Sequence, residues 1–405
     1  MQLPHMDLTR TRKLMKQRGI DVLLASSPEN AFYASGYKPF LTVFGPVIVI
    51  VPVDPGLAPT MILSGYLEEP AKSLSYIEDI RSYRPWMPIV PVNDLLAGTV
   101  KIPPKPPKHL AVQTAVNILS DCLVEKGLQD SVIASENNLL ADSDAHSLLI
   151  KCLPKVNFVE AENIFFELRK IKTEDEIRAL QLAGDLTVKG FKAIIEGAVS
   201  GATIGELQLR YKRGVMEAAD ADNAMWLEDV RAGITAGDYF KSLQSQEYRV
   251  SEGDIIWSDG GLVVYGYTSD MARTFSVGKP GTLQKKIFTT LKSGYEEALS
   301  LIKPGVQLKE VYKTIHHAMH MGGFDWYARG HCGHSVGIGP GKGEQPPMIT
   351  AVEESVFEPN MVIAVECGCY VSGHFGGFSI EEMLRITPDG YEVMTGELSR
   401  DMLEI

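Results

Sequence analysis

Five residues in the second half of the sequence have side chains suited to binding metal ions. They are Asp259, Asp270, His334, Glu366 and Glu381. Each acid follows or interrupts an apolar, strand-like stretch, as Asp259 follows Ile255-Ile256-Trp257. A single acid in such a place is usually a solvated residue at a strand end. Several converging carboxylates repel one another, however, and two divalent ions would compensate their charge. The pattern therefore predicts a site for two divalent metal ions.

The strands around Asp259 and Asp270 should bring these two acids together. Eleven residues separate them, and Gly260 and Gly261 could supply a turn between two strands. Two strands joined tightly would place both carboxylates side by side. His334 lies in a glycine-flanked segment, 333–337, and Glu366 ends an apolar run.

The rest of the chain predicts two domains. In the first, an amphipathic stretch at Leu8–Arg18 alternates with the strand-like runs 22–24 and 47–51, which favours an α/β domain. Thr173 and Glu176 form the pattern of a capping box, which predicts that a long helix begins there. We place the boundary near residue 165 and predict domains at 1–164 and 165–405.

The composition narrows the function and the compartment. The chain has 405 residues, with 39 Lys plus Arg against 51 Asp plus Glu, a formal charge of -12. This acidic balance disfavours nucleic acid and anionic membranes as partners, since both bind through cationic patches. We find no apolar run long enough to span a bilayer, no signal peptide, and five cysteines, too few for a disulfide framework. We therefore expect a cytoplasmic protein.

The five candidate ligands also resemble a known pattern in their order and local contexts. Those contexts are Tyr267-Thr268-Ser269-Asp270-Met271-Ala272-Arg273-Thr274, Gly333-His334-Ser335-Val336-Gly337 and Glu358-Pro359-Asn360-Met361-Val362-Ile363-Ala364-Val365-Glu366. The pattern is similar to the signature of the pita-bread metallopeptidases, which include methionine aminopeptidase, aminopeptidase P, prolidase and the metal-free relative creatinase. The resemblance implies an α/β (α+β) protein. An N-terminal creatinase-like α/β domain would be followed by a C-terminal pita-bread catalytic domain.

The resemblance also implies a role for each ligand. Asp259 would chelate one ion, Asp270 and Glu381 would bridge the two, His334 would bind the other, and Glu366 would complete its shell. The ions would activate a water molecule and polarise the scissile carbonyl, with Glu366 as the general base. Mn, Co, Fe or Zn would suit this set of ligands.

Prolidase-like enzymes further imply a homodimer in which the small domain reaches toward the neighbouring subunit's site. Aromatic residues of that domain, Trp86 and Tyr37, are then candidates for contacts with the substrate. Packing in the core or at an interface is the ordinary alternative for both.

The sequence departs from the family where peptidases usually hold the substrate. The segment Gly233–Ser242 contains no histidine, and Gly330 stands where a second histidine is usual, with His331 one step later. His331 could act as an acid or as an oxyanion donor, or it could be an ordinary loop residue. Ser379 replaces a basic residue two positions before Glu381.

The leading prediction is a hydrolase resembling Xaa-Pro dipeptidase or aminopeptidase P, which cleaves an amide bond in a dipeptide or small peptide-like substrate. The altered substrate-holding residues favour an alternative: creatinase-like or ectoine-hydrolase-like C–N hydrolysis of a small molecule, or a lyase reaction. A third class is a binding module of the kind found in histone chaperones. Four converging carboxylates weigh against that class, because a binding module has no need of them.

Overall fold

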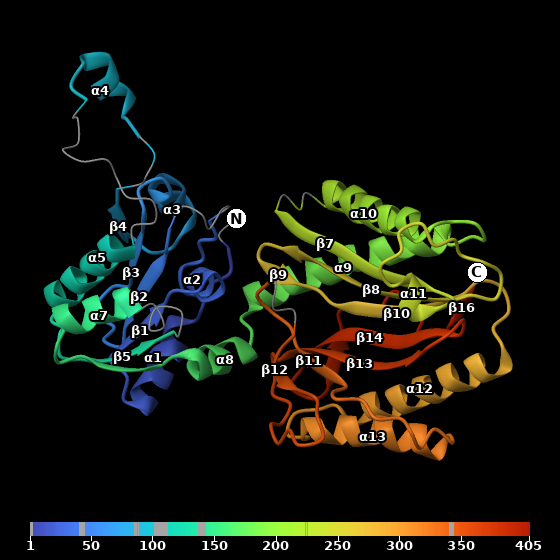
Figure 1. The fold of residues 1–405 in the computed structure, drawn as a ribbon. Helices are drawn as coiled ribbons and strands as arrows, with labels where there is room; N and C mark the ends of the chain where they lie inside the picture. Colours follow the sequence, from blue (N-terminus) through green and yellow to red (C-terminus); the bar gives the residue numbers. More distant parts are fainter. Residues whose placement is uncertain are drawn as a thin grey trace. The chain divides into compact units, whose positions relative to one another are not determined.

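The chain folds into two compact units, Met1–Arg169 and Lys170–Ile405 (Figure 1). The computed structural model describes residues 3–39, 45–84, 87, 89–100, 112–136, 143–222, 224, 226–339 and 344–405. The predicted boundary near residue 165 falls inside helix α8 (Glu162–Lys170), and the division between the units comes at the end of that helix. Both units combine helices with a sheet, so the chain has the mixed α/β class that the sequence predicts.

The N-terminal unit is built on a six-stranded sheet in the order β4-β3-β2-β1-β5-β6. Its strands are β1 (Val22–Ala25), β2 (Ile48–Pro52), β3 (Thr60–Ser64), β4 (Asp79–Tyr83), β5 (Val132–Ser135) and β6 (Asn157–Glu160). Its helices are α1 (Leu8–Arg18), α2 (Pro28–Ser35), α3 (Glu68–Leu74), α4 (Val92–Ala97), α5 (Val112–Glu125), α7 (Ser143–Cys152) and α8. The central strands β1, β2 and β3 are buried along their whole length, as expected for a sheet inside an α/β domain.

Local signals in the sequence account for the first helix. The Asp7 side chain accepts hydrogen bonds from the backbone N–H groups of Thr9 and Arg10, and so caps the helix start. Gly19 ends the helix in the left-handed conformation, with φ 65°. The helix predicted at Leu8–Arg18 is therefore confirmed.

The C-terminal unit is built on a ten-stranded sheet whose main path runs β12-β11-β13-β14-β10-β8-β7. Its strands are β7 (Leu227–Ala236), β8 (Ile255–Val264), β9 (Tyr267–Thr268), β10 (Met271–Ser276), β11 (Gly333–Ser335), β12 (Gln345–Met348), β13 (Val362–Val371), β14 (Gly376–Ile386), β15 (Tyr391–Val393) and β16 (Leu403–Glu404). Neighbouring strands along the main path are antiparallel. Residues that lie far apart in the sequence are therefore brought into register across the sheet.

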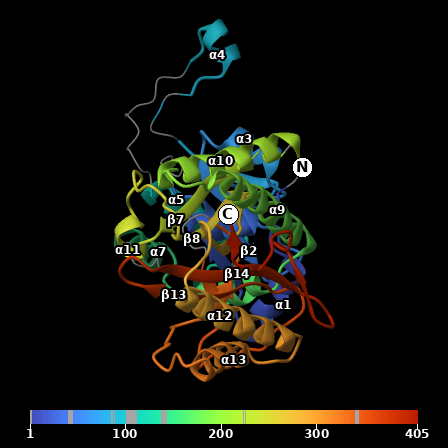
Figure 2. The same ribbon diagram turned by 90° about the vertical axis from the view of Figure 1, so that its right-hand side faces the viewer.

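Two pairs of helices cover this sheet, as Figures 1 and 2 show. The pairs are α9 (Glu174–Gly197) with α10 (Ile204–Ala221) and α12 (Thr282–Leu301) with α13 (Leu308–Met321), and the short helix α11 (Tyr239–Ser242) belongs to neither pair. Helices α9 and α10 pack with β7, β8 and β10 into one hydrophobic core, while α12 and α13 pack with β13 and β14 into a second. The capping box predicted at Thr173 and Glu176 is present and begins α9.

The turn between the first two acids is not where the sequence suggested. Gly260 and Gly261 lie inside β8, and the chain turns at Tyr265 and Gly266, with φ 50° and 83°. Such a two-residue turn with positive φ at both positions is the favoured hairpin connection. Gly261 is instead needed for close approach, since a Cβ there would lie 2.0 Å from the Ser269 carbonyl oxygen.

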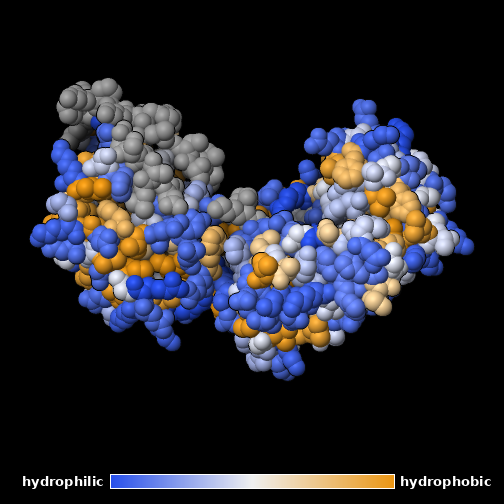
Figure 3. Space-filling view, turned by 60° about the horizontal axis from the view of Figure 1, so that its bottom comes forward, coloured by the Kyte–Doolittle hydropathy of each residue, from blue (hydrophilic) through white to orange (hydrophobic). Residues whose placement is uncertain are grey.

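The cysteines and the surface agree with an ordinary globular protein. All five cysteines carry free thiols, and Cys332, Cys367 and Cys369 are buried in the core beneath α12 and α13. Within the described ranges, we find no helix that is both long and apolar enough to cross a bilayer. Figure 3 shows one face, where hydrophilic side chains are interspersed with hydrophobic patches.

Candidate metal centre

The sheet of the C-terminal unit aligns the predicted ligands side by side. Asp259 pairs with Ala272, Ala272 pairs with Glu381, and Glu381 pairs with Glu366, on four adjacent strands. We call these four residues the carboxylate row. Because the residues are in register, their side chains leave the same face of the sheet. Their neighbours in sequence, such as Ile380 and Cys367, point the other way into the core beneath α12 and α13.

The other two predicted ligands flank this row on the same face. Asp270 lies two residues before Ala272, and His334 on β11 pairs with Ala364, two residues before Glu366. The His334 Nε2 atom lies 3.7 Å from a Glu381 oxygen and 3.8 Å from an Asp270 oxygen. Asp270, His334 and Glu381 thus offer ligand atoms that all lie within 4.8 Å of one another.

Asp259 and Glu366 occupy the two ends of the row. They stand outside that tight group of three, but they are close enough for their charges to influence the others. The structure therefore places all five predicted ligands on one face of the sheet and brings three of them into mutual contact range.

Burial and mutual repulsion make the carboxyl groups resist ionisation. Burial, followed by the neighbouring Asp270 and Glu366 charges, raises the pKa of Asp259 well above its ordinary value. Burial likewise raises the pKa of Glu381, with further repulsion from Asp270, Glu366 and Asp259. Burial raises the pKa of Asp270 to about 6. A cation would relieve this repulsion and favour the ionised forms.

The tautomer and the charge state of the His334 imidazole suit a metal ligand. Its Nδ1 lies 3.3 Å from the Ser335 carbonyl oxygen, which can only accept a hydrogen bond, so Nδ1 carries the proton. The Nε2 atom, which faces Asp270 and Glu381, then keeps its lone pair. Burial lowers the pKa of His334, so the ring stays neutral. A neutral ring with its second nitrogen fixed by a carbonyl is the usual arrangement for a metal-binding histidine.

These residues fit a pair of divalent ions. The donors are four carboxylates and one imidazole, a set suited to hard or borderline divalent cations. The same residues without cations would form a buried cluster of like charges, which is destabilising. The chemistry of the donors and the raised pKa values of Asp259, Asp270 and Glu381 both favour metal binding.

Glu366 has two further partners that occupy its oxygens. The Arg329 guanidinium forms an ion pair with one carboxylate oxygen, and the His331 Nδ1 lies 3.1 Å from the other. Arg329 also donates from Nε to the His331 carbonyl oxygen at 2.8 Å, which orders the loop that carries both residues. His331, predicted as a catalytic residue, is therefore placed beside Glu366, and its side chain is 26% exposed.

Arg329 and several aromatic residues near the row were not predicted from the sequence. Trp257, Tyr239 and Tyr370 form a cluster, with ring centroids 4.7 to 5.8 Å apart. Trp257 precedes Asp259 by two residues and Tyr370 follows Glu366 by four, so strand periodicity could have placed both on the ligand face. For Arg329, which lies in a loop, we see no comparable signal.

Two residues of the small domain, Trp86 and Tyr37, were predicted to contact the substrate. Trp86 lies outside the described residues. Tyr37 is 2% exposed, and burial raises its pKa to about 12. A ring buried in its own domain is poorly placed to contact a substrate, so this role for Tyr37 stays a prediction from the sequence alone.

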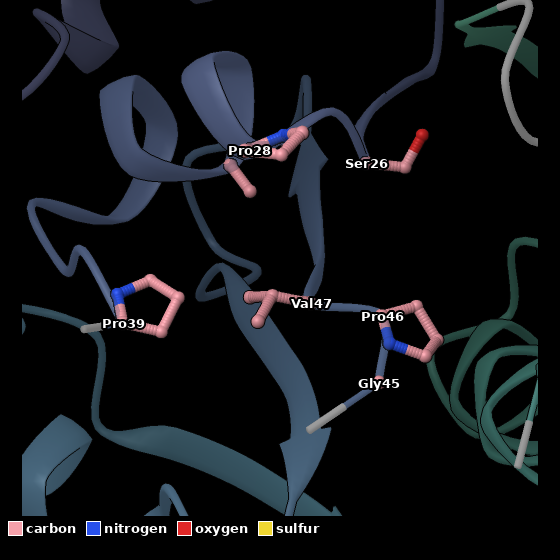
Figure 4. A pocket seen from close by; sticks show the side chains of 7 residues that line it. Ser26, Pro28, Pro39, Gly45, Pro46 and Val47 are labelled. Atoms are coloured by element: carbon pink, nitrogen blue, oxygen red, sulfur yellow. The ribbon is translucent and has the colours of Figure 1, made fainter. Parts of the chain in front are cut away.

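A separate apolar pocket lies in the N-terminal unit (Figure 4). It has a volume of about 220 Å³ and is lined by Ser26, Pro28, Ala31, Pro39, Gly45, Pro46 and Val47. The described residues that line it carry no ionisable side chain, and none of them is a candidate metal ligand.

Comparison with known proteins assigns the chain to a family. The sequence model of metallopeptidase family M24 matches residues 178–388, and that of the creatinase/prolidase N-terminal domain matches residues 8–171. The chain belongs to metallopeptidase family M24 and carries this N-terminal domain. The pita-bread family and the two-domain fold predicted from the sequence are confirmed.

Individual relatives are distant in sequence and close in fold. An Xaa-Pro dipeptidase of Pyrococcus horikoshii is 27% identical over 241 residues, which cover 59% of this chain and 66% of that protein, just under two thirds. The structure of an Xaa-Pro dipeptidase from Bacillus anthracis matches 98% of this chain and 99% of its own at 20% identity, with a TM-score of 0.78. An X-Pro aminopeptidase from Thermotoga maritima matches the same shares at 19% identity, with a TM-score of 0.76. At such identities the structures show a shared fold.

Proposed function

We propose that this protein is a dinuclear-metal-dependent hydrolase that cleaves an amide (C–N) bond in a dipeptide or small peptide-like substrate, as an Xaa-Pro dipeptidase does. The observation that carries the proposal is the carboxylate row with Asp270 and His334 on the same face of the sheet. Mn, Co, Fe or Zn ions held there would activate a water molecule and polarise the scissile carbonyl.

The residues of the chain have separate roles in this proposal. The ions would be held by Asp259, Asp270, His334, Glu366 and Glu381. Glu366, as the general base, takes a proton from the attacking water. Its neighbour His331, 3.1 Å away, is suited to hold that proton and pass it to the leaving amine.

One observation favours a small-molecule amide over a peptide. The segment Gly233–Ser242 contains no histidine to hold a peptide. The end of this segment forms α11, where Tyr239 packs against Trp257 and Tyr370, so aromatic rings lie in the segment in which a histidine is usual. Creatinase-like or ectoine-hydrolase-like C–N hydrolysis, or a lyase reaction, is therefore the alternative function.

Metal analysis and a panel of substrates test the proposal. Protein reconstituted separately with Mn, Co, Fe and Zn should bind two ions per chain and hydrolyse Gly-Pro or Leu-Pro. Asp270→Asn should reduce turnover by more than about a hundredfold. Substitution of a residue that only hydrogen-bonds to a metal ligand already lowers metal affinity or activity about 10- to 100-fold. Turnover of creatine, ectoine or dimethylsulfoniopropionate with no turnover of the dipeptides would establish the alternative. Absence of bound metal would refute both.

We also propose that the protein is a cytoplasmic homodimer. Helix α4 supports self-association, because all of its residues are exposed while its sequence contains Val92, Leu95 and Leu96. Figures 1 and 2 both show α4 lying apart from the rest of its unit. Apolar side chains that are exposed together on one short helix are typical of an interface.

The oligomeric state tests this second proposal. Light scattering at micromolar concentration should give the mass of a dimer, and Leu95→Ser with Leu96→Ser should lower it toward that of a monomer. Leu209→Ser, at a single exposed leucine on α10, is the matched control and should leave the mass unchanged. A wild-type protein that is monomeric and fully active would contradict the proposal.

A further inference from the structure

The sheet holds the five candidate ligands to different degrees. Asp259, Glu366 and Glu381 lie within strands of ten or eleven residues, where backbone hydrogen bonds to neighbouring strands fix their direction. Asp270 lies between β10 and the two-residue strand β9. His334 lies in the three-residue strand β11, whose pairing with β12 is irregular at this point. The last two ligands therefore depend on support from outside the long strands.

A buried lysine supports the residue that follows His334. Lys172 lies two residues before helix α9 and is 4% exposed, and its Nζ atom donates to the Ser335 Oγ at 2.9 Å. Its backbone N–H donates to the Asn360 carbonyl oxygen at 2.9 Å, which fixes where the side chain starts. The Ser335 carbonyl oxygen is the acceptor that faces the His334 Nδ1 atom. Lys172 therefore fixes the residue that selects the tautomer of His334.

A buried carboxylate joins the start of α9 to strand β9. Glu176 is 1% exposed, and its Oε1 atom accepts from the Tyr267 hydroxyl at 3.1 Å. Burial raises the pKa of Glu176, whereas a hydrogen bond from the Thr173 N–H and the charge of Lys172 favour its ionised form. Glu176 thus compensates the buried charge of Lys172 and anchors β9, the strand that leads to Asp270.

Further along α9, a threonine supports the residue that precedes Asp270. The Thr187 Oγ1 lies 2.7 Å from the Ser269 Oγ, and both residues are fully buried. The Ser269 Oγ also accepts from the backbone N–H of Leu262 on β8 at 3.0 Å. Thr187 follows Glu176 by about three helical turns, so both side chains leave the same side of α9. One side of this helix therefore contacts both segments that flank Asp270 and β9.

We propose that the first half of α9, together with Lys172 just before it, is the positioning element for the two ligands that the long strands do not hold. Lys172 acts on His334 through the neighbouring serine. Thr187 acts in the same way on Asp270. A helix of 24 residues is a rigid support, and a metal site requires its ligands to be fixed by partners behind them. This inference rests on the proposed function, because it concerns the same ligand set.

Metal titration tests the inference without turnover. Lys172→Met and Thr187→Val should each lower the affinity for Mn by about tenfold or more, as loss of a residue that supports a metal ligand does. Lys170→Met is the matched control for the lysine, since it breaks a partly exposed ion pair with Glu358 in the same segment. Thr11→Val is the control for the threonine, because Thr11 is also buried and makes the same hydrogen bond to the backbone four residues earlier. Both controls should bind Mn as the wild type does.

Further variants separate positioning from a purely structural role. Ser335→Ala should reproduce the loss of affinity seen in Lys172→Met, and the double variant should lose little more, because both changes remove one hydrogen bond. Lys172→Arg keeps a donor and should restore part of the affinity. The visible absorption of the Co-loaded protein reports the ligand geometry and should change in Lys172→Met and in Ser335→Ala. Ser335→Ala also carries the test should Lys172→Met fail to fold.

Two results would overturn the inference alone. One is wild-type Mn affinity and an unchanged Co spectrum in Lys172→Met and Thr187→Val, even if urea unfolding in EDTA shows lower stability. The other is an equal loss of affinity in Thr11→Val, which would show that loss of any buried threonine hydroxyl has the same effect. A wild-type protein that binds no metal would instead refute the proposed function, and the inference with it.

Discussion

Glu366 and Glu381 lie directly opposite each other on the antiparallel strands β13 and β14. Like charges in directly opposed positions destabilise a sheet, and both of these side chains are buried. The next residue, Glu382, faces the other side of the sheet, where Arg273 and Arg400 neutralise it. On the ligand face Arg329 forms an ion pair with Glu366, and bound cations would compensate the charge that remains on the two carboxylates.

Glu381→Gln should separate stability from metal binding. In the metal-free protein at pH 8, removing one of two opposed charges should raise the free energy of unfolding by about 1 kcal/mol. Metal at about a hundred times its Kd should raise the free energy of unfolding of the wild type by about 2.7 kcal/mol. The same metal concentration should raise that of the variant much less, because one ligand carboxylate is missing. Thermal unfolding with and without EDTA and Mn measures both effects. A metal-free variant less stable than the wild type would contradict this account of the pair.

The raised pKa of Asp270 should make the metal-free protein more stable in mild acid. Between the ordinary value of 3.8 and the folded value of about 6, the folded state binds a proton that the unfolded state does not. The contribution of Asp270 to stability therefore grows as the pH falls through 6 and is lost as the pH rises through it. When the pH is lowered from 7.5 to 4.5, the free energy of unfolding of the wild type should rise by about 2 kcal/mol relative to that of Asp270→Asn. This follows from about 1.4 kcal/mol for each pH unit between the two pKa values. Urea unfolding in EDTA at both values checks the sign, and a change in the opposite direction would exclude a raised pKa.

Removal of Arg273 should destabilise the C-terminal unit strongly. Arg273 is 1% exposed, and its guanidinium lies 2.7 Å from Glu382 and donates to the carbonyl oxygens of Ser399 and Glu381. Arg273→Met should cost about 3–5 kcal/mol, because it leaves a buried charge with one partner fewer. Urea unfolding measures the loss, and Arg178→Met, which breaks the exposed ion pair with Asp175, should cost less than about 1 kcal/mol. Equal losses in the two variants would show that burial does not decide the effect.

Gly261→Ala should disturb the metal centre through the backbone. The added methyl group would lie 2.0 Å from the carbonyl oxygen of Ser269, the residue before Asp270. The β8–β9 hairpin must then shift, at a cost of about 1–3 kcal/mol, and metal affinity should fall with it. Gly330→Ala is the control, since a Cβ there meets nothing within 4 Å. Thermal unfolding and metal titration of the two variants should differ clearly, and equal behaviour would show that the close approach at Gly261 is unimportant.

Several helix ends and all five candidate ligands could be predicted from short segments of the sequence. Asp7 and Gly19 delimit α1, and the capping box at Thr173 and Glu176 begins α9. The five ligands were predicted from their order and contexts, because each lies in a short segment whose residues are recognisable by themselves. Local hydrogen bonds and strand alternation act within a few residues, so such features can be read without knowing the fold.

Only the tertiary structure decided which residues meet across the sheet. The turn lies at Tyr265 and Gly266, whereas Gly261 lies inside β8 and allows the close approach of Ser269, which the sequence does not reveal. Arg329 meets Glu366 because α13 holds its backbone beside β13, through residues that show no common pattern with the acids. Asp259, Ala272, Glu381 and Glu366 become one row only when antiparallel pairing sets the register of four strands. That register is determined by packing of the whole sheet against its helices, over contacts a hundred residues apart, and no local pattern specifies it.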